Sequence, residues 1–154
     1  MGIFSATPAV KEIQLQKEYR FMYENFIISS QQILYLLVEE NNGVVDALKF
    51  NFSIYKYGYP NDEALGAHPM AKFGLKWYSL FEVENSPWIE ELKNSNRVHH
   101  RHSDSLYKDR KHYIVTFKDV TLDVITSSPY EEVTLTKDEI IGFVSQQLAY
   151  LNAD

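Results

Sequence analysis

The chain of 154 residues contains no cysteine. This absence excludes a disulfide framework, a metal site built from thiolates and a cysteine nucleophile. It is compatible with the reducing conditions of the cytoplasm, and a cytoplasmic location is therefore expected.

Long apolar runs are also missing from the sequence. No stretch approaches the ~20 apolar residues that a membrane-spanning helix needs. The first eleven residues, MGIFSATPAVK, lack the basic start and the apolar run of a signal peptide. The net formal charge of −6 disfavours general binding to the phosphates of nucleic acids. We therefore expect neither a membrane nor a nucleic acid as a partner.

The composition is otherwise that of an ordinary globular domain. Hydrophobic residues make up 45% of the chain and charged residues 23%, so a packed core is expected. No internal repeat, low-complexity linker or change of composition divides the sequence. These observations predict a single α+β domain over residues 1–154, with flexible residues at 1–10.

Runs rich in β-branched and aromatic residues predict that strands form most of the fold. The run 33–39 (ILYLLVE) is followed by Asn42-Gly43, and a second such run begins at Val44. Because Asn and Gly tolerate positive φ, this pair predicts a hairpin turn. The remaining predicted strands are 49–59, 77–83, 112–118, 120–126 and 132–135. The runs 112–118 and 120–126 form either a hairpin or one long bent strand.

Two helices have clear start signals. Ser86 can cap a helix that has Pro87 at its first position, where the missing N–H has no cost. Thr136 and Glu139 form a capping box before a run with helical spacing of apolar residues. The region 12–24 fits strand or helix, and strand is favoured. Together these elements predict a mostly antiparallel sheet of about six to eight strands with two helices packed on it.

Apolar and polar residues alternate in the predicted strand 49–59. Phe50, Phe52 and Ile54 fall on one face, which is the predicted core face. The tyrosines of the opposite face cover either a second layer of the protein or a half-open cleft. Under the cleft interpretation, the candidate binding residues of this aromatic face are Tyr55, Tyr57, Tyr59 and Trp77.

The least ordinary part of the sequence is the stretch 97–112, RVHHRHSDSLYKDRKH, which holds four of the five histidines. We call it the basic segment, because its formal charge is +3 while the rest of the chain sums to −9. This asymmetry indicates a site or a switch, and three interpretations of it are open.

The first interpretation is a divalent metal as cofactor. If residues 98–104 are extended, His100, His102 and Asp104 point to the same face, and such a set suits Zn²⁺, Mn²⁺ or Fe²⁺. His68 or His112 could complete the set. The neighbouring lysines and arginines oppose a dication, and no complete motif such as HExxH is present.

The second interpretation is anion capture with acid–base chemistry. Arg97, Arg101 and Arg110 could hold a carboxylate or a phosphate while a histidine transfers a proton. No glycine-rich phosphate loop or GxSxG motif accompanies them. Asp119 and Asp123 could share a strand face, but such residues are more often solvated charges at a strand edge.

The third interpretation is an exposed polar loop, because 94–96 and 103–105 are clusters of turn-forming residues. Two functions follow from these alternatives. The first is a small binding module that contacts a protein partner, another copy of itself or a small anionic ligand. The second is a hydrolase or isomerase that depends on a metal or on the histidines of 99–112. No complete catalytic set can be written from the sequence, so the binding module is favoured and no catalytic residue is assigned.

Overall fold

The longest strand, β4 (Val44–Gly58), organises the sheet in the computed structural model, which describes residues 6–21 and 26–152. The sheet has eight strands among the described residues. Seven follow the order β1-β5-β6-β7-β4-β3-β2, β8 also pairs with β4, and all pairs are antiparallel. The other strands are β1 (Ala9–Glu12), β2 (Phe26–Ser30), β3 (Ile33–Asn41), β5 (Leu80–Glu84), β6 (Lys111–Thr116), β7 (Thr121–Thr126) and β8 (Glu131–Thr136). With helices α1 (Pro87–Ser95) and α2 (Lys137–Leu151), this arrangement confirms the predicted α+β fold.

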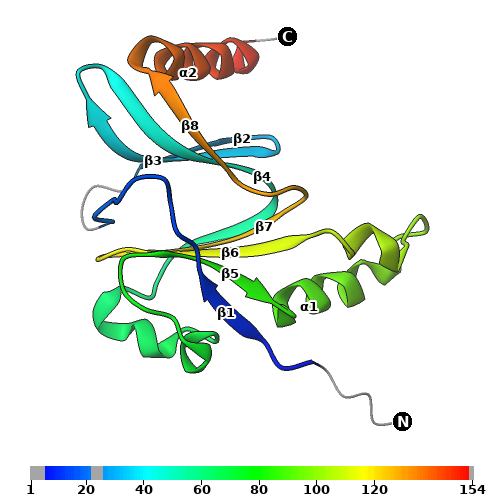
Figure 1. The fold of residues 1–154 in the computed structure, drawn as a ribbon. Helices are drawn as coiled ribbons and strands as arrows, with labels where there is room; N and C mark the ends of the chain where they lie inside the picture. Colours follow the sequence, from blue (N-terminus) through cyan, green and yellow to red (C-terminus); the bar gives the residue numbers. More distant parts are fainter. Residues whose placement is uncertain (1–5, 22–25, 153–154) are drawn as a thin grey trace, which may run out of the picture.

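The sheet folds over itself along β4 and gives two layers (Figure 1). The first half of β4 pairs with β3 and β8, and the second half pairs with β7. The main hydrophobic core fills the space between the layers. Leu36, Phe50, Val115 and Leu122 are fully buried there.

The layer made by β5, β6 and β7 is also covered on its outer face. Met70 packs there against Phe81, Val83 and Ile114 in a second, smaller apolar cluster. Helix α1 lies beside the same layer, between β5 and β6 in the chain (Figure 1). Because both faces of this layer are covered, all six residues of β7 are buried. A polar side chain on its outer face is therefore held inside the protein.

The local signals in the sequence are confirmed. Asn42 and Gly43 have φ values of 52° and 81°, and they connect β3 to β4 as a hairpin. Ser86 Oγ accepts the backbone N–H of Ile89 at the start of α1, and the capping box of Thr136 and Glu139 is present at α2. Strands β6 and β7 form a hairpin rather than one bent strand.

The predicted alternation in β4 breaks at a β-bulge. The register with β7 shifts between Phe52 and Ile54, which moves the following residues to the opposite face. Phe50 is fully buried, whereas Ile54 is 37% exposed, so the assignment of Ile54 to the core is wrong. Tyr55 takes the core side instead and packs edge-on against Phe52, with ring centroids 4.9 Å apart.

Two other boundaries differ from the prediction. Residues 13–21 form neither a helix nor a paired strand, although Ile13 and Phe21 pack on the main core; residues 22–25 lie outside the described residues. The predicted strand 77–83 begins only at Leu80. The expected flexible region 1–10 lies outside the described residues in its first five positions, and Ala9 already belongs to β1.

Helix α2 rests on the outside of the layer formed by β3 and β8, and it buries none of its residues. Its Phe143 stacks on Tyr35, with centroids 5.2 Å apart and planes 8° from parallel. Val144 and Leu148 remain about half exposed, so close packing of this helix is not observed. No helix within residues 6–21 and 26–152 is long and apolar enough to cross a membrane.

Candidate functional site

Residues 97–110 of the basic segment form tight turns rather than an extended strand. Two short 3₁₀ helices lie here, η3 (Asn96–Val98) and η4 (Asp104–Tyr107), and hydrogen-bonded turns connect them. Residues 98–104 are therefore not extended, and an extended strand was the condition for placing His100, His102 and Asp104 on one face.

His102 is held by partners within the segment. Its Nε2 lies 2.7 Å from Asp104 Oδ1, and its Nδ1 lies 2.9 Å from the side-chain amide of Asn96. Arg97 also pairs with Asp104, at 3.3 Å. These contacts stabilise the turn and occupy both nitrogens of the imidazole.

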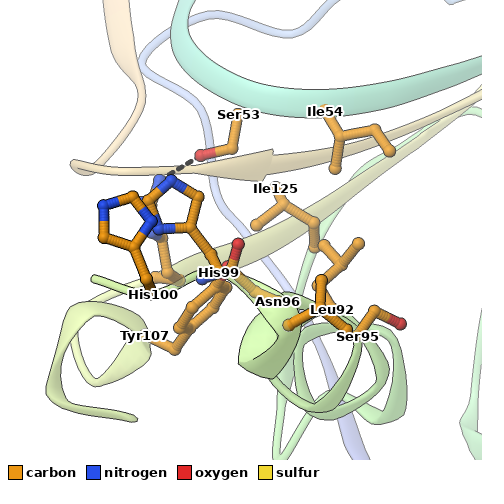
Figure 2. A pocket seen from close by; sticks show the side chains of 11 residues that line it. Ser53, Ile54, Leu92, Ser95, Asn96, His99, His100, Tyr107 and Ile125 are labelled. Carbon is orange, nitrogen blue, oxygen red and sulfur yellow. Dashed lines mark hydrogen bonds between the residues drawn. The ribbon is translucent and has the colours of Figure 1, made fainter. Parts of the chain in front are cut away.

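A surface pocket of about 660 Å³ lies between the basic segment, the end of α1 and the bulge of β4. We call it the basic pocket. Ile54, Leu92 and Ile125 form an apolar side of this pocket. Figure 2 shows these three side chains on one side and His99 and His100 on the other. The two imidazole rings stack, with centroids 4.9 Å apart and planes 13° from parallel.

Arg110 supplies the cation of the basic pocket. Its guanidinium donates from Nη1 to Ser53 Oγ and from Nε to the carbonyl oxygen of Leu106, the latter at 3.3 Å. It also lies 5.5 Å from the centre of the Tyr107 ring. Within the described part of the chain, no carboxylate forms an ion pair with Arg110. The side chain is thus held in one position, and its charge has no counter-ion among residues 6–21 and 26–152.

The three arginines predicted as an anion clamp do not converge. Arg97 pairs with Asp104, and Arg101 lies exposed in the turn, where its backbone N–H donates to His99 Nδ1. Only Arg110 lines the basic pocket. The sequence gives no signal that Arg110, rather than Arg97 or Arg101, would line a pocket. The placement of Arg110 depends on the turns that bring it to Ser53.

A second pocket, of about 290 Å³, lies at the other end of α1, on the outer face of β7 and β4. We call it the carboxylate pocket. Its lining includes Lys56, Tyr59, Trp88, Glu91, His112 and Asp123. His68 also lines this pocket, where it bonds to the same carboxylate as His112, the last residue of the basic segment.

Asp123 lies at the centre of a buried hydrogen-bond network. His68 Nε2 donates to Asp123 Oδ1 at 2.7 Å, and His112 Nε2 donates to Oδ2 at 2.8 Å. The other ring nitrogen of His112, Nδ1, lies 2.7 Å from Ser86 Oγ and extends the network to this residue. Asp123 is 8% exposed, so its interpretation as a solvated strand-edge charge is wrong. A usable signal was its place inside the strand TLDVIT, where every other residue is apolar or a threonine.

The protonation pattern of this network follows from its partners. His68 Nδ1 accepts the backbone N–H of Met70 at 3.0 Å, so the ring carries its proton on Nε2. Burial by itself raises the pKa of Asp123, but the hydrogen bonds from His112 and His68 outweigh it and hold this pKa below its ordinary value. The carboxylate is therefore ionised and acts only as an acceptor.

Among the described residues, no group of three or more histidine, aspartate or glutamate side chains is arranged to hold a metal ion. The five residues predicted as metal ligands are divided between separate places. His102 and Asp104 bond to each other, His100 stacks on His99, and His68 and His112 bond to Asp123.

The predicted aromatic face is likewise divided. Tyr55 packs on the core, and Tyr57 is 38% exposed without lining either pocket. Trp77 donates its indole N–H to the carbonyl oxygen of Asp62 at 3.1 Å. Of the four residues, only Tyr59 lines one of the two pockets.

No family model matches the chain, and neither a curated protein nor a solved structure matches it. The function is therefore argued from the two pockets alone.

Proposed function

We propose that the protein is a small binding module that takes an organic anion with an apolar body into the basic pocket. The observation that carries this proposal is Arg110, a fixed guanidinium without a carboxylate partner in the described chain, on the wall of a pocket with an apolar side. The ligand class is a carboxylate or phosphate joined to a ring or short hydrocarbon.

The position of Arg110 favours binding because its side chain is already ordered. A free arginine loses side-chain entropy when it binds an anion, and contacts that hold it in place beforehand reduce this cost. Ser53 and the carbonyl of Leu106 provide such contacts. A guanidinium has five N–H donors, so it can keep these bonds and still donate to an oxyanion.

The apolar side of the pocket supplies a second attraction. Ile54 is 37% exposed and lies directly opposite Ile125 on the neighbouring strand. Leu92 of α1 reaches the same space (Figure 2). Covering Ile54 and Leu92 with a ligand removes apolar surface from water, which is favourable by roughly 25 cal/mol per Å², whereas Ile125 is already fully buried. A purely inorganic anion would gain nothing from this surface.

Calorimetric titration with phenyl phosphate tests the proposal, with benzyl alcohol as the uncharged comparison. Arg110→Gln should weaken phenyl phosphate binding by about tenfold or more, because a hydrogen bond to a charged group contributes about 1.5–3 kcal/mol. Arg101→Gln is the matched control. It removes the same charge from the same segment, at a residue that does not line the pocket.

Different outcomes for these variants separate a site from general attraction. Loss of binding with Arg110→Gln and little change with Arg101→Gln supports the basic pocket. Equal losses in the two variants would instead assign binding to the overall charge of the segment and refute the pocket. Equal affinity for benzyl alcohol and phenyl phosphate would also refute it, because Arg110 would then contribute nothing.

A further inference from the structure

The carboxylate pocket contains a charged group that the proposed anion site does not use. Asp123 retains 12% of its side-chain surface, whereas His112 retains 3%. Both lie on the lining of the pocket, but the carboxylate is the more accessible of the two. A ligand that enters this pocket can therefore reach the side chain of Asp123.

The imidazoles have no nitrogen left for a ligand. His68 uses Nδ1 for the N–H of Met70 and Nε2 for Asp123. His112 uses Nε2 for Asp123 and Nδ1 for Ser86. Metal coordination or direct proton exchange through these rings would require one of these bonds to break. The carboxylate differs, since its two oxygens offer about four acceptor sites and, among the described residues, His68 and His112 fill two of them.

Two carboxylates, Asp123 and Glu91, and one ammonium, Lys56, line the pocket. Asp123 is ionised, as its lowered pKa indicates, and the backbone N–H of Met70 fixes His68 as the neutral tautomer. Glu91 adds a second carboxylate to the lining. An ionised carboxylate with free acceptor sites favours a positively charged donor over a neutral or anionic group.

The aromatic wall of the pocket already holds an ammonium group. Lys56 Nζ lies 4.3 Å from the ring centre of Trp88, which is the geometry of a cation–π contact. Lys56 lies directly opposite Asp123 across the β4–β7 pair, and its side chain is exposed. It can swing into solvent, and a ligand ammonium can then occupy the space between the indole and the carboxylate.

We infer that the carboxylate pocket binds a small organic amine, with the ammonium on Asp123 and the apolar body against Trp88 and Met70. The volume of about 290 Å³ suits a ligand of the size of benzylamine. This site is independent of the anion site, because no residue lines both pockets.

Calorimetric titration with benzylamine tests the inference, with benzyl alcohol and benzoate as uncharged and anionic comparisons. Benzylamine should bind at least about tenfold more tightly than benzyl alcohol, as expected for one hydrogen bond to a charged acceptor. Asp123→Asn should remove this preference. Arg110→Gln, in the other pocket, should leave benzylamine binding unchanged.

Lys56→Met keeps the test decisive if Asp123→Asn does not fold. This variant removes the competing ammonium while Asp123 and its histidines stay intact, so it should tighten benzylamine binding. Weaker or unchanged binding in Lys56→Met would overturn the inference. So would tighter binding of benzoate than of benzylamine by the Arg110→Gln variant, which lacks the cation of the basic pocket, or no binding of benzylamine by the wild-type protein.

Discussion

Replacement of Asp123 should separate the roles of its two histidine partners. Asp123→Ala leaves the Nε2–H groups of His68 and His112 without an acceptor, and these rings are only 8% and 2% exposed. A buried N–H group left without an acceptor costs about 1–3 kcal/mol, so the two groups together cost several kcal/mol. That loss is a large share of the about 5–15 kcal/mol by which a domain is typically stable.

Asp123→Asn should cost less, about 1–3 kcal/mol, because His112 can adapt to the amide. Ser86 Oγ can accept as well as donate, so His112 can move its proton to Nδ1 and accept the amide N–H at Nε2. His68 cannot change in this way, since the N–H of Met70 occupies its Nδ1. The amide oxygen must therefore face His68.

Urea unfolding followed by tryptophan fluorescence measures these differences. Asp119→Ala is the matched control, because Asp119 is an exposed residue of the turn between β6 and β7 and should change stability by less than about 0.5 kcal/mol. A loss below about 1 kcal/mol for Asp123→Ala would refute the buried network. Equal losses for the Ala and Asn variants would refute the tautomer argument for His112.

Further predictions concern acid, the helix cap, the hairpin and metals. The pKa of Asp123 is lower in the folded state than the ordinary value of about 3.9. Its ionised form therefore stabilises the fold above about pH 4, and this contribution is lost as the pH falls through the folded-state pKa. Asp123→Asn should flatten the acid side of a stability–pH curve, and an unchanged curve would contradict this. Ser86→Ala should cost about 1–3 kcal/mol in urea unfolding, because it removes both the cap of α1 and the partner of His112; a neutral effect would count against the network. Gly43→Val should destabilise the protein by about 1 kcal/mol or more, since a β-branched residue opposes a φ of 81°, and an unchanged melting temperature would disprove it. Chelation with EDTA should leave the melting temperature unchanged, because both nitrogens of His68 and of His102 have intramolecular partners; a drop of several degrees would restore the metal hypothesis.

Local features of the fold could be predicted because their causes are local. The turn at Asn42-Gly43 depends on positive φ at two adjacent residues. The caps at Ser86 and Thr136 depend on side chains that bond to N–H groups three residues later. Each of these causes is written within a few positions of the sequence.

Features that depend on distant contacts were not predictable. The bulge between Phe52 and Ile54 is set by the register with β7, and it reversed the assignment of Ile54 and Tyr55. The apolar strand around Asp123 indicated its burial, but its partner His68 lies 55 residues away, so the hydrogen-bond network had no local signal. The composition of 97–112 did indicate an unusual region, but only the turns around Tyr107 explain why Arg110 faces a pocket and Arg101 does not.

The most direct test of the basic pocket is an NMR titration of the wild-type histidine side chains with phenyl phosphate. His99 and His100 line that pocket, whereas His68 and His112 are buried at the other one. Binding as proposed should shift the signals of His99 and His100 until they saturate, and leave those of His68 and His112 in place. Equal shifts in all of these histidines, or shifts confined to His68 and His112, would contradict the proposed site.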